Sequence, residues 1–501
     1  MTTLEVLVVG AGPVGLTAAH ELARQGLRVR LVDAAAGPAT TSRALATHAR
    51  TLETYDQMGV LDELLPRGQR VEHFTLHQNG RRLVRFDTDY SRLPTRFPFT
   101  LMVDQVITEE VLRTAVARHG VEVEWGVRLT AFTDHGDRVA VTLEHADGRV
   151  EELETGWLAG CDGGHSTVRK QLGLKLLGES SETWLIADAL VDCDLPRDSI
   201  HWMRTPAGTI MLVPFPDERK WRLLDTAEVS HAGDPAAVAR RFAEKISAGT
   251  GLPAEVSSPS WVSVFTIQQR MIERMRVGRC LLAGDAAHVH SPASGQGMNT
   301  GVQDAVNLSW KLAAVVRGEA GDELLDSYSA ERVPVGANLL KSTRMATMLV
   351  QLKSRKAAAA LRTMFTIVKS LPPLKSRIER KIMGGMSALD LSYESGVGTR
   401  AGRVTAARLA ESSGWRDLVL ELQRPEWTLV TFGAPETHAG VRVLSTSDEL
   451  LRADLGLEPG GWMLIRPDGY VSAVSGSGSV RDALAAAGVR EVTEHGVPQA
   501  R

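Results

Sequence analysis

Residues 4–33 have the sequence LEVLVVGAGPVGLTAAHELARQGLRVRLVD. The apolar run from Val6 to Val9 does not alternate with polar residues, which is typical of a strand buried on both faces of a parallel sheet. A glycine-rich turn follows, and residues 16–25 have the pattern of a helix that ends at Gly26. Residues 29–33 indicate a second strand that closes with an acid. The stretch therefore predicts a β-α-β unit.

The turn of this unit has the spacing GxGxxG, formed by Gly10, Gly12 and Gly15, with Pro13 and Val14 inside it. The first glycine allows a tight bend, the second lets backbone N–H groups approach a pyrophosphate, and the third lets helix and strand pack closely. Asp33 lies 18 residues after Gly15, where a carboxylate accepts hydrogen bonds from a ribose. These features predict a dinucleotide site, and the acid favours NAD or FAD over NADP.

A second segment, residues 279–299, has the sequence RCLLAGDAAHVHSPASGQGMN and leads into a helix that reaches about Val316. Asp285, after Gly284 at the end of a buried strand, is placed to bind a chain of hydroxyl groups. The N–H groups that open the helix can face an electron-rich group. This arrangement suits the ribityl chain and ring of a flavin, whose reduced anion a helix N-terminus would stabilise. The turn and helix start contain Gly295, Gly297, Met298 and Asn299.

A third motif, CDGGHSTVR at residues 161–169, lies between these two. In order and spacing, the three motifs resemble those of the FAD-dependent aromatic hydroxylases, the class A flavoprotein monooxygenases built like p-hydroxybenzoate hydroxylase. Further stretches, THARTLE at 47–53, RFPF at 96–99 and the segment from 290 to 304, resemble the subgroup of pentachlorophenol monooxygenase and the aromatic polyketide hydroxylases. The likeness is good to about residue 335 and weaker beyond it.

The resemblance implies particular cofactor contacts. Arg43 and Gln105 would contact FAD near its pyrophosphate and ribityl groups, and Asp285 would hold the ribityl chain. Asp162 and Arg169 match the motif that supports FAD and a passing nicotinamide cofactor. From the residues alone, Asp162 is equally well explained as a turn acid, and an arginine like Arg169 is more often an exposed helix charge.

The resemblance also implies an α/β fold in which a Rossmann-like FAD-binding domain is interleaved with an antiparallel β-sheet substrate domain. Apolar runs at 200–203, 209–214 and 221–224 predict consecutive strands of that sheet. We name Trp202, Met211 and Arg222 as substrate contacts, although core packing explains Met211 better. The expected division is 1–72, 100–180 and 268–395 for FAD, 73–99 and 181–267 for substrate, and 398–501 for a thioredoxin-like C-terminal domain.

The activity implied by the resemblance is an FAD- and NAD(P)H-dependent hydroxylation of a phenolic, polycyclic, polyketide-type aromatic compound. Hydride transfer to FAD and reaction with O2 would give a flavin C4a-hydroperoxide that delivers OH to a ring carbon. Because the chain has no second GxGxxG unit, NADPH or NADH would dock only transiently. No catalytic residue is assigned, and His48 is a candidate base. Baeyer–Villiger oxygen insertion on the same scaffold and a flavin-binding module without turnover remain open alternatives.

Composition excludes several other functions. The 501 residues allow about three domains, and 57 basic against 60 acidic residues leave a net charge of −3, so nucleic acid is not an expected partner. The three cysteines form no CxxC pair, which argues against disulfides and thiolate metal sites. His288 and His290 lack a third clustered ligand, so no metal is expected. No apolar run reaches the roughly 18–20 residues of a membrane span, and we expect a cytoplasmic protein.

Two segments have an open role. Residues 341–383 contain eleven basic residues and one acid, Glu379, in a pattern that predicts amphipathic helices. They are explained by a solvated face, by steering of NADPH phosphates, or by contact with an acidic partner. The segment 398–501 has no cysteine and therefore no dithiol chemistry. Its expected role is structural or oligomeric, and a homodimer is one form of the latter.

Overall fold

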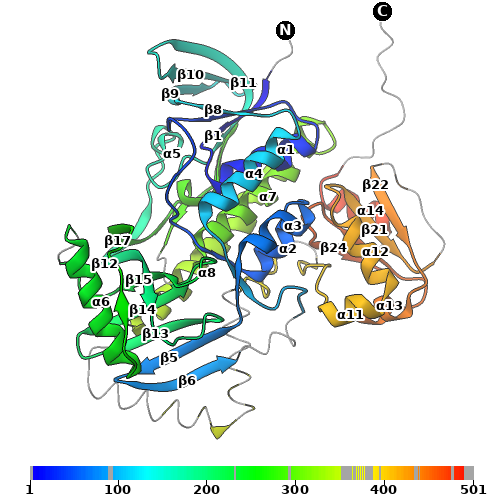
Figure 1. The fold of residues 1–501 in the computed structure, drawn as a ribbon. Helices are drawn as coiled ribbons and strands as arrows, with labels where there is room; N and C mark the ends of the chain where they lie inside the picture. The colour runs from blue at the N-terminus through cyan, green and yellow to red at the C-terminus, as the bar shows by residue number, and fades with distance from the viewer. Residues whose placement is uncertain are drawn as a thin grey trace, which may run out of the picture.

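The structure is a computed structural model, and Figure 1 shows its arrangement. It describes residues 4–87, 94–230, 233–290, 295–350, seven single positions from 364 to 377, and 387–393, 397–433, 438, 440–475 and 479–489. The side chains of residues 87, 180–182 and 342–350 are not among those described. The described residues form a mixed α/β fold with parallel and antiparallel sheets.

The first sheet contains eight strands: β1 (Leu4–Val9), β2 (Val29–Asp33), β8 (Val123–Trp125), β9 (Val127–Asp134), β10 (Val139–His145), β11 (Val150–Gly160), β18 (Arg276–Val277) and β19 (Cys280–Leu282). Its order is β18-β19-β11-β1-β2-β8, with β10 and β9 attached at β11. The central pairs, β19 with β11, β11 with β1, β1 with β2 and β2 with β8, are all parallel. The predicted buried run at Val6–Val9 is at most 6% exposed, as expected for a central parallel strand.

Three helices pack together beside this sheet: α1 (Pro13–Arg24), α4 (Gln105–Ala117) and α7 (Gly297–Val316). Helix α1 begins three residues before the predicted start, because Pro13 occupies its first position, where the missing N–H costs nothing. The end of α7 agrees with the prediction. Two short helices, α2 (Ala49–Gln57) and α3 (Leu61–Leu64), follow the short strand β3 (Ala46–Thr47), and α2 also contacts α7.

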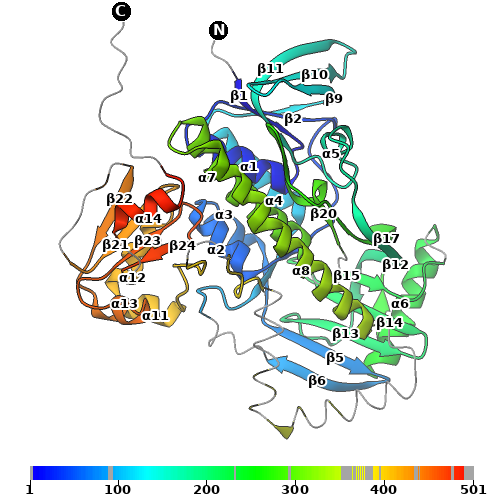
Figure 2. The same ribbon diagram turned by 180° about the vertical axis from the view of Figure 1, so that it is seen from behind.

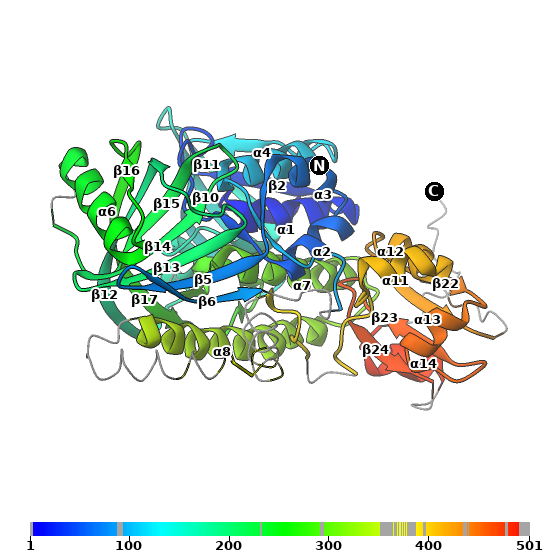
Figure 3. The same ribbon diagram turned by 60° about the horizontal axis from the view of Figure 1, so that its bottom comes forward.

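The second sheet contains nine strands: β5 (His73–Gln78), β6 (Arg81–Asp87), β12 (Leu177–Asp192), β13 (Ser199–Thr205), β14 (Gly208–Pro214), β15 (Lys220–Asp225), β16 (Glu255–Val256), β17 (Trp261–Met271) and β20 (His288–Val289). The predicted consecutive strands between 200 and 224 are β13, β14 and β15, and they pair antiparallel. The pairing of β13 with β5 is parallel. Helix α6 (Pro235–Thr250) covers one face, as Figure 3 shows.

A three-stranded sheet and a long helix link the two large sheets. The small sheet joins β3 (Ala46–Thr47), β7 (Thr100–Met102) and β4 (Gln69–Val71). Helix α8 (Asp326–Val350) follows the 3-10 turn at Asp322–Leu325 and contacts β17, so it runs from one sheet to the other (Figure 2). The predicted helices at 341–383 lie largely outside the described residues, although the helical backbone of α8 extends to Val350.

The C-terminal unit is a four-stranded sheet with helices, placed to one side of the molecule in Figure 1. Its strands are β21 (Trp427–Thr431), β22 (Val441–Ser445), β23 (Trp462–Ile465) and β24 (Val471–Val474), in the order β22-β21-β23-β24. The first pair is parallel and the other two pairs are antiparallel, which includes the predicted hairpin after Trp462. The helices are α11 (Ala406–Glu411), α12 (Ser413–Glu421), α13 (Glu449–Asp454) and α14 (Val480–Ala486).

A buried network of charges joins this unit to α7 and α8. Glu331 accepts hydrogen bonds from Lys311 Nζ at 2.8 Å and from both terminal nitrogens of Arg466 at 2.7 and 2.9 Å. Arg466 also donates to Asp468 at 2.6 Å. All four side chains are at most 6% exposed. Each charge in this desolvated joint therefore depends on its partners.

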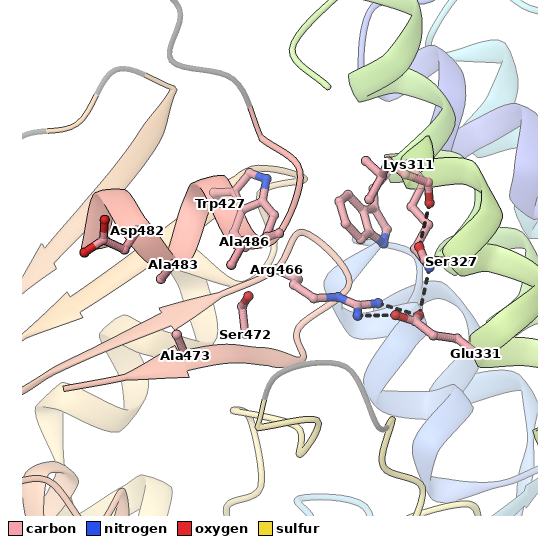
Figure 4. A pocket seen from close by; sticks show the side chains of 13 residues that line it. Lys311, Ser327, Glu331, Trp427, Arg466, Ser472, Ala473, Asp482, Ala483 and Ala486 are labelled. Atoms are coloured by element: carbon pink, nitrogen blue, oxygen red, sulfur yellow. Dashed lines mark hydrogen bonds and ion pairs between the residues drawn. The ribbon is translucent and has the colours of Figure 1, made fainter. Parts of the chain in front are cut away.

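A cavity of about 450 Å³ lies at the same joint. Figure 4 shows Trp427, Ala483 and Ala486 on one side and Lys311, Ser327 and Glu331 on the other. The ring centroids of Trp310 and Trp427 are 5.7 Å apart in an edge-on contact. No residue predicted to bind cofactor lines this cavity, so it belongs to the joint between units.

We predict that Glu331→Ala lowers the free energy of unfolding by about 3–5 kcal/mol, because it leaves two buried cations without their shared carboxylate. Urea titration followed by tryptophan fluorescence measures this difference. Glu154→Ala serves as a control, because Glu154 pairs with Arg138 on the exposed surface and its loss should leave stability almost unchanged. Equal effects of the two substitutions would contradict the role assigned to the joint.

Candidate cofactor and substrate site

The three sequence motifs meet at one edge of the first sheet. Strand β1 leads into Gly10, β2 ends at Asp33, β11 leads into Asp162, and β19 leads into Gly284 and Asp285. Because these strands are parallel, their carboxyl ends lie on the same side of the sheet. In open α/β sheets this edge is where ligands bind. The tertiary structure therefore brings together residues that are up to 275 positions apart.

The GxGxxG turn contains two glycines required by packing and one that faces open space. Gly10 has a φ of +102°, and a Cβ there would lie 2.4 Å from the Cys161 carbonyl oxygen. A Cβ on Gly15 would lie 1.8 Å from the Gly10 carbonyl oxygen. A Cβ on Gly12, which caps the N-terminus of α1, would meet no atom within 4 Å. The packing therefore explains Gly10 and Gly15, whereas Gly12 borders space beside a helix N-terminus, which favours anions.

Asp33 is fixed by the backbone around it. Its Oδ2 accepts a hydrogen bond from the N–H of Ala11 at 2.6 Å, and its Oδ1 accepts one from Ala35 at 2.7 Å. The carboxylate thus joins the end of β2 to the glycine turn. A carboxylate has about four lone-pair positions, so capacity for further donors remains.

Gln105 holds the backbone next to Arg43. The amide oxygen of Gln105 accepts a hydrogen bond from the N–H of Ala44 at 2.9 Å, and its NH2 group donates to Glu109 at 2.7 Å. The hydroxyl of Ser42 accepts from the N–H of Val106 at 3.3 Å. Arg43 itself is exposed. The start of α4 therefore supports the short loop that carries Arg43.

The Gly284–Asp285 turn packs directly against the first glycine turn. Gly284 has a φ of +61°, and a Cβ there would lie 2.8 Å from Val14, which also lies close to Gly301 of α7. The Asp285 side chain is exposed to solvent, although surrounding protein raises its pKa; the charges of His288 and Arg43 oppose this rise. Val14 is thus a packing residue at this contact, and Asp285 is open to a ligand.

The Asn299 side chain connects the start of α7 to β3 and its neighbour His48 through hydrogen bonds. The amide of Asn299 donates to the carbonyls of Ala46 at 2.9 Å and Gly295 at 2.7 Å, and its oxygen accepts from the N–H of His48 at 2.8 Å. His48 is 3% exposed, and its Nδ1 lies 3.2 Å from the Thr100 hydroxyl. Gly297 and Met298, at the first helical positions, are partly exposed. Residues 291–294 of the preceding turn lie outside the described part.

Asp162 and Arg169 hold the third motif together. Asp162 Oδ2 accepts from the N–H groups of Thr167 at 2.6 Å and Val168 at 3.1 Å, which begin the short helix α5 (Thr167–Gln171). Its Oδ1 is buried and has no hydrogen-bond partner among the described residues. Arg169 is 5% exposed and donates to the carbonyls of Ala286 and Gly164. Arg169 therefore ties this motif to the Gly284–Asp285 turn and is not an exposed helix charge.

A buried ion pair between Asp304 and His288, with Arg332 as a second partner of Asp304, lies behind the Asp285 turn and was not predicted. Asp304 of α7 accepts from His288 Nε2 at 2.6 Å, from Arg332 Nε at 2.7 Å and from the N–H of Gly284 at 3.1 Å. The three side chains are at most 1% exposed. Burial alone would lower the pKa of His288, but the Asp304 carboxylate reverses this and the net pKa is raised. The available sequence signal was a stripe of polar residues at helical spacing in α7: Asp304, Asn307 and Lys311.

The second sheet turns a buried apolar face toward this site. Trp202 and Met211 are 6% and 5% exposed and pack in one cluster with Leu45 and Met102 from the cofactor side. Arg222, on a neighbouring strand of the same sheet, is 4% exposed and directs its donors at Asp188 and at loop carbonyls. The structure thus places all three predicted substrate residues in the layer between the two sheets.

Two negative observations apply to the part of the chain that the structure describes. No group of three or more His, Cys, Asp or Glu side chains there is arranged to hold a metal ion, and His288 and His290 stack with ring centroids 6.2 Å apart. No helix among the described residues has the length and apolar character needed to cross a bilayer.

The pairing of His288 with Asp304 predicts that the free energy of unfolding depends on pH. The pKa of His288 is raised in the folded protein. The protonated ring therefore contributes fully to the free energy of unfolding below the unfolded-state pKa of about 6.5, and this contribution is lost as the pH rises through the folded-state pKa. The stability advantage of the wild type over His288→Gln should therefore shrink as pH increases from 6. Urea unfolding at several pH values measures it, with the exposed His165→Gln as control. A difference that stays constant across pH would refute the charged pairing of His288 with Asp304.

Comparison with known proteins agrees with this geometry. Residues 3–343 match the family described as FAD binding domain. The chain is 51% identical to 6-methylpretetramide 4-monooxygenase of Streptomyces rimosus, over 94% of this chain and 90% of the relative. It is 29% identical to pentachlorophenol 4-monooxygenase of Sphingobium chlorophenolicum, over 94% of each chain.

A solved structure supports the same assignment. The anhydrotetracycline hydroxylase OxyS from Streptomyces rimosus superposes with a TM-score of 0.77 at 31% identity, covering 96% of this chain and 98% of that one. The three motifs, their meeting at one sheet edge and these similarities agree with one another. The chain belongs to the FAD-dependent aromatic monooxygenases, in the subgroup of pentachlorophenol monooxygenase and the aromatic polyketide hydroxylases.

Proposed function

We propose that this FAD-dependent monooxygenase hydroxylates a phenolic, polycyclic aromatic compound of the polyketide type, with NADPH or NADH as a transient electron donor. The observation that carries the substrate class is the high identity, along almost the whole chain, to a relative named for its action on 6-methylpretetramide. The buried apolar layer around Trp202 and Met211 supports it, because a flat, largely apolar ring system needs such a surface.

The residues at the sheet edge fit FAD. Gly12 borders open space at a helix N-terminus, Asp285 is open to solvent, and the buried Asp162 Oδ1 has no partner among the described residues. We assign the adenosine ribose to Asp33 and the pyrophosphate to the turn at Gly12. The remaining FAD contacts that we assign are Arg43, Gln105, Asp162, Arg169, Gly284, Asp285, Gly295, Gly297, Met298 and Asn299.

FAD, when bound, accepts hydride from the nicotinamide cofactor and activates O2 for transfer to the substrate. The protein positions the substrate, excludes water from the site and polarises the reacting groups. The first turn of α7 favours negative charge through its N–H groups and helix dipole, and Asp304 holds that helix to the Gly284 turn. The apolar layer between the sheets excludes water. His48 stays our candidate base: if its Nδ1 donates to the Thr100 hydroxyl, its Nε2 is the basic atom.

We also propose the domain division 1–72, 100–180 and 268–395 for FAD, 73–99 and 181–267 for substrate, and a thioredoxin-like unit at 398–501. The strand order β22-β21-β23-β24, with the first pair parallel and the last antiparallel, supports the last assignment. Its buried joint with α7 and α8 favours a structural role.

A homodimer would appear as twice the chain mass in analytical ultracentrifugation. We place the enzyme in the cytoplasm.

The two kinds of glycine give a matched test of the FAD site. Gly12→Ala should leave the apoprotein as stable as the wild type, because its Cβ meets no protein atom, but should weaken FAD binding about tenfold or more by filling the space of the pyrophosphate. Flavin fluorescence titration of apoprotein measures the Kd. Gly37→Ala, also in open space but outside the motifs, is the control that should change neither quantity.

Gly15→Ala should instead destabilise the fold itself, because its Cβ would overlap the Gly10 carbonyl. Unchanged FAD affinity in Gly12→Ala, with a folded protein, would overturn the placement of the pyrophosphate at this turn. Equal stability losses in Gly12→Ala and Gly15→Ala would show that the distinction between the two glycines is wrong.

The enzymatic activity is tested by anaerobic reduction. Purified flavoprotein mixed with NADPH should lose its yellow colour, and we expect one aromatic polyketide scaffold in a panel of polyphenols to accelerate this reaction. Stopped-flow absorbance near 450 nm measures the rate. A protein that never bleaches with NADPH or NADH, with any compound of the panel, would exclude the enzymatic proposal and leave a flavin-binding module.

The product distinguishes hydroxylation from oxygen insertion. Under 18O2, hydroxylation should add one labelled oxygen as a ring hydroxyl, with the ring carbonyl signals of the substrate retained in the NMR spectrum. A product in which a ring ketone has become a lactone would contradict hydroxylation.

A further inference from the structure

Arg222 of β15 makes hydrogen bonds in two directions. Its Nε and Nη2 donate to the two carboxylate oxygens of Asp188 on β12, both at 2.8 Å. Its Nη1 donates to the carbonyl of Arg43 at 2.7 Å and its Nη2 to the carbonyl of Ser42 at 2.8 Å. The first pair of bonds stays inside the second sheet, whereas the other two cross to the loop beside the cofactor site.

The guanidinium is held rigidly in this orientation. Arg222 and Asp188 have side chains only 5% and 9% exposed. The Arg222 group lies over the rings of Phe215 and Trp261, at 5.2 and 5.5 Å from their centroids. A fork fixed by a bidentate carboxylate and stacked between aromatic rings loses little further freedom when it binds additional acceptors.

The need for this ion pair is not explained by the stability of the sheet alone. Apolar side chains of similar size often replace a buried ion pair without loss of stability. Strands β12 and β15 already share a continuous antiparallel register through these residues. What apolar side chains would not supply is the pair of charge-assisted bonds to the carbonyls of Ser42 and Arg43.

Those carbonyls belong to a loop that is already held from the cofactor side. Gln105 accepts from the N–H of Ala44, and the Ser42 hydroxyl accepts from the start of α4. Leu45, the next residue, packs in the apolar layer with Trp202. The charge of Arg43 opposes the rise in the pKa of Asp285. The loop therefore lies between the two sheets and is fastened to both.

We propose that Arg222, oriented by Asp188, is a positioning residue that holds the Ser42–Arg43 backbone from the substrate sheet and so fixes Arg43 at the FAD site. In this role Arg222 acts through the loop backbone and needs no contact with the substrate. The inference rests on the proposed function in assigning FAD to Arg43. The substrate sheet thereby contributes to FAD affinity without touching the cofactor.

Two variants separate positioning from stability. Asp188→Leu combined with Arg222→Met removes the pair without leaving a buried charge, so the apoprotein should keep nearly the thermal stability of the wild type. Its Kd for FAD should rise about tenfold to a hundredfold, because two charge-assisted bonds to the loop are lost. Asp188→Asn should lower stability more than the double substitution but weaken FAD binding less, because Arg222 loses the carboxylate that orients it yet can still donate to both carbonyls.

Asp225 and Lys245 give a control on the other face of the sheet, where Arg241 is a second cation beside Asp225. Their ion pair, 2.6 Å long and at most 3% exposed, lies on the opposite side of the same sheet against α6. Asp225→Leu combined with Lys245→Met should leave the Kd for FAD unchanged. Flavin fluorescence titration and thermal unfolding of each apoprotein supply both readouts.

The FAD titrations distinguish a failure of the positioning role from a failure of the proposed function. Wild-type apoprotein that takes up no FAD would refute the FAD assignment itself. If the wild type binds FAD and the folded protein with Asp188→Leu and Arg222→Met binds it equally well, the positioning role of Arg222 is wrong. An FAD affinity that follows thermal stability across all variants, the Asp225–Lys245 control included, would likewise overturn it.

Discussion

The close approach of helix α1 to the ends of β1 and β11 is the constraint around which the cofactor half of the molecule is arranged. No side chain fits between Gly15 and the Gly10 carbonyl, or between Gly10 and Cys161. Helix and strands can meet at this distance only through glycine. The consequence is a helix N-terminus, a fixed acid and an open Gly12 at one sheet edge, where an anionic cofactor is favoured.

Helix α7 is the second organising element, and its buried polar residues reach different parts of the protein. Asp304 holds the Gly284 turn and His288, whereas Asn307 and Lys311 bond to Glu331 at the joint with the C-terminal unit. Such buried groups are stable only when they are fully partnered. A single helix thus links the geometry of the cofactor turn to the attachment of residues 397–489.

Local patterns in the sequence predicted the local elements well. The unalternating run at Val6–Val9 is a central parallel strand, and the runs between 200 and 224 are antiparallel neighbours. These features depend on side-chain periodicity and turn residues, which a sequence displays directly. The parallel pairing of β13 with β5 was not predicted, because no local signal brings together strands about 125 residues apart.

By itself, the sequence determined the dinucleotide turn, the order of the three motifs and the family, because these depend on residue type at short spacing. Only the tertiary structure decided that Arg222 binds loop carbonyls, that Arg169 is buried against Ala286, and that Asp304 pairs with His288. The partners of a buried polar group come from distant parts of the chain. Periodicity can place such a side chain on a face, but it does not identify the groups that approach that face in the folded protein.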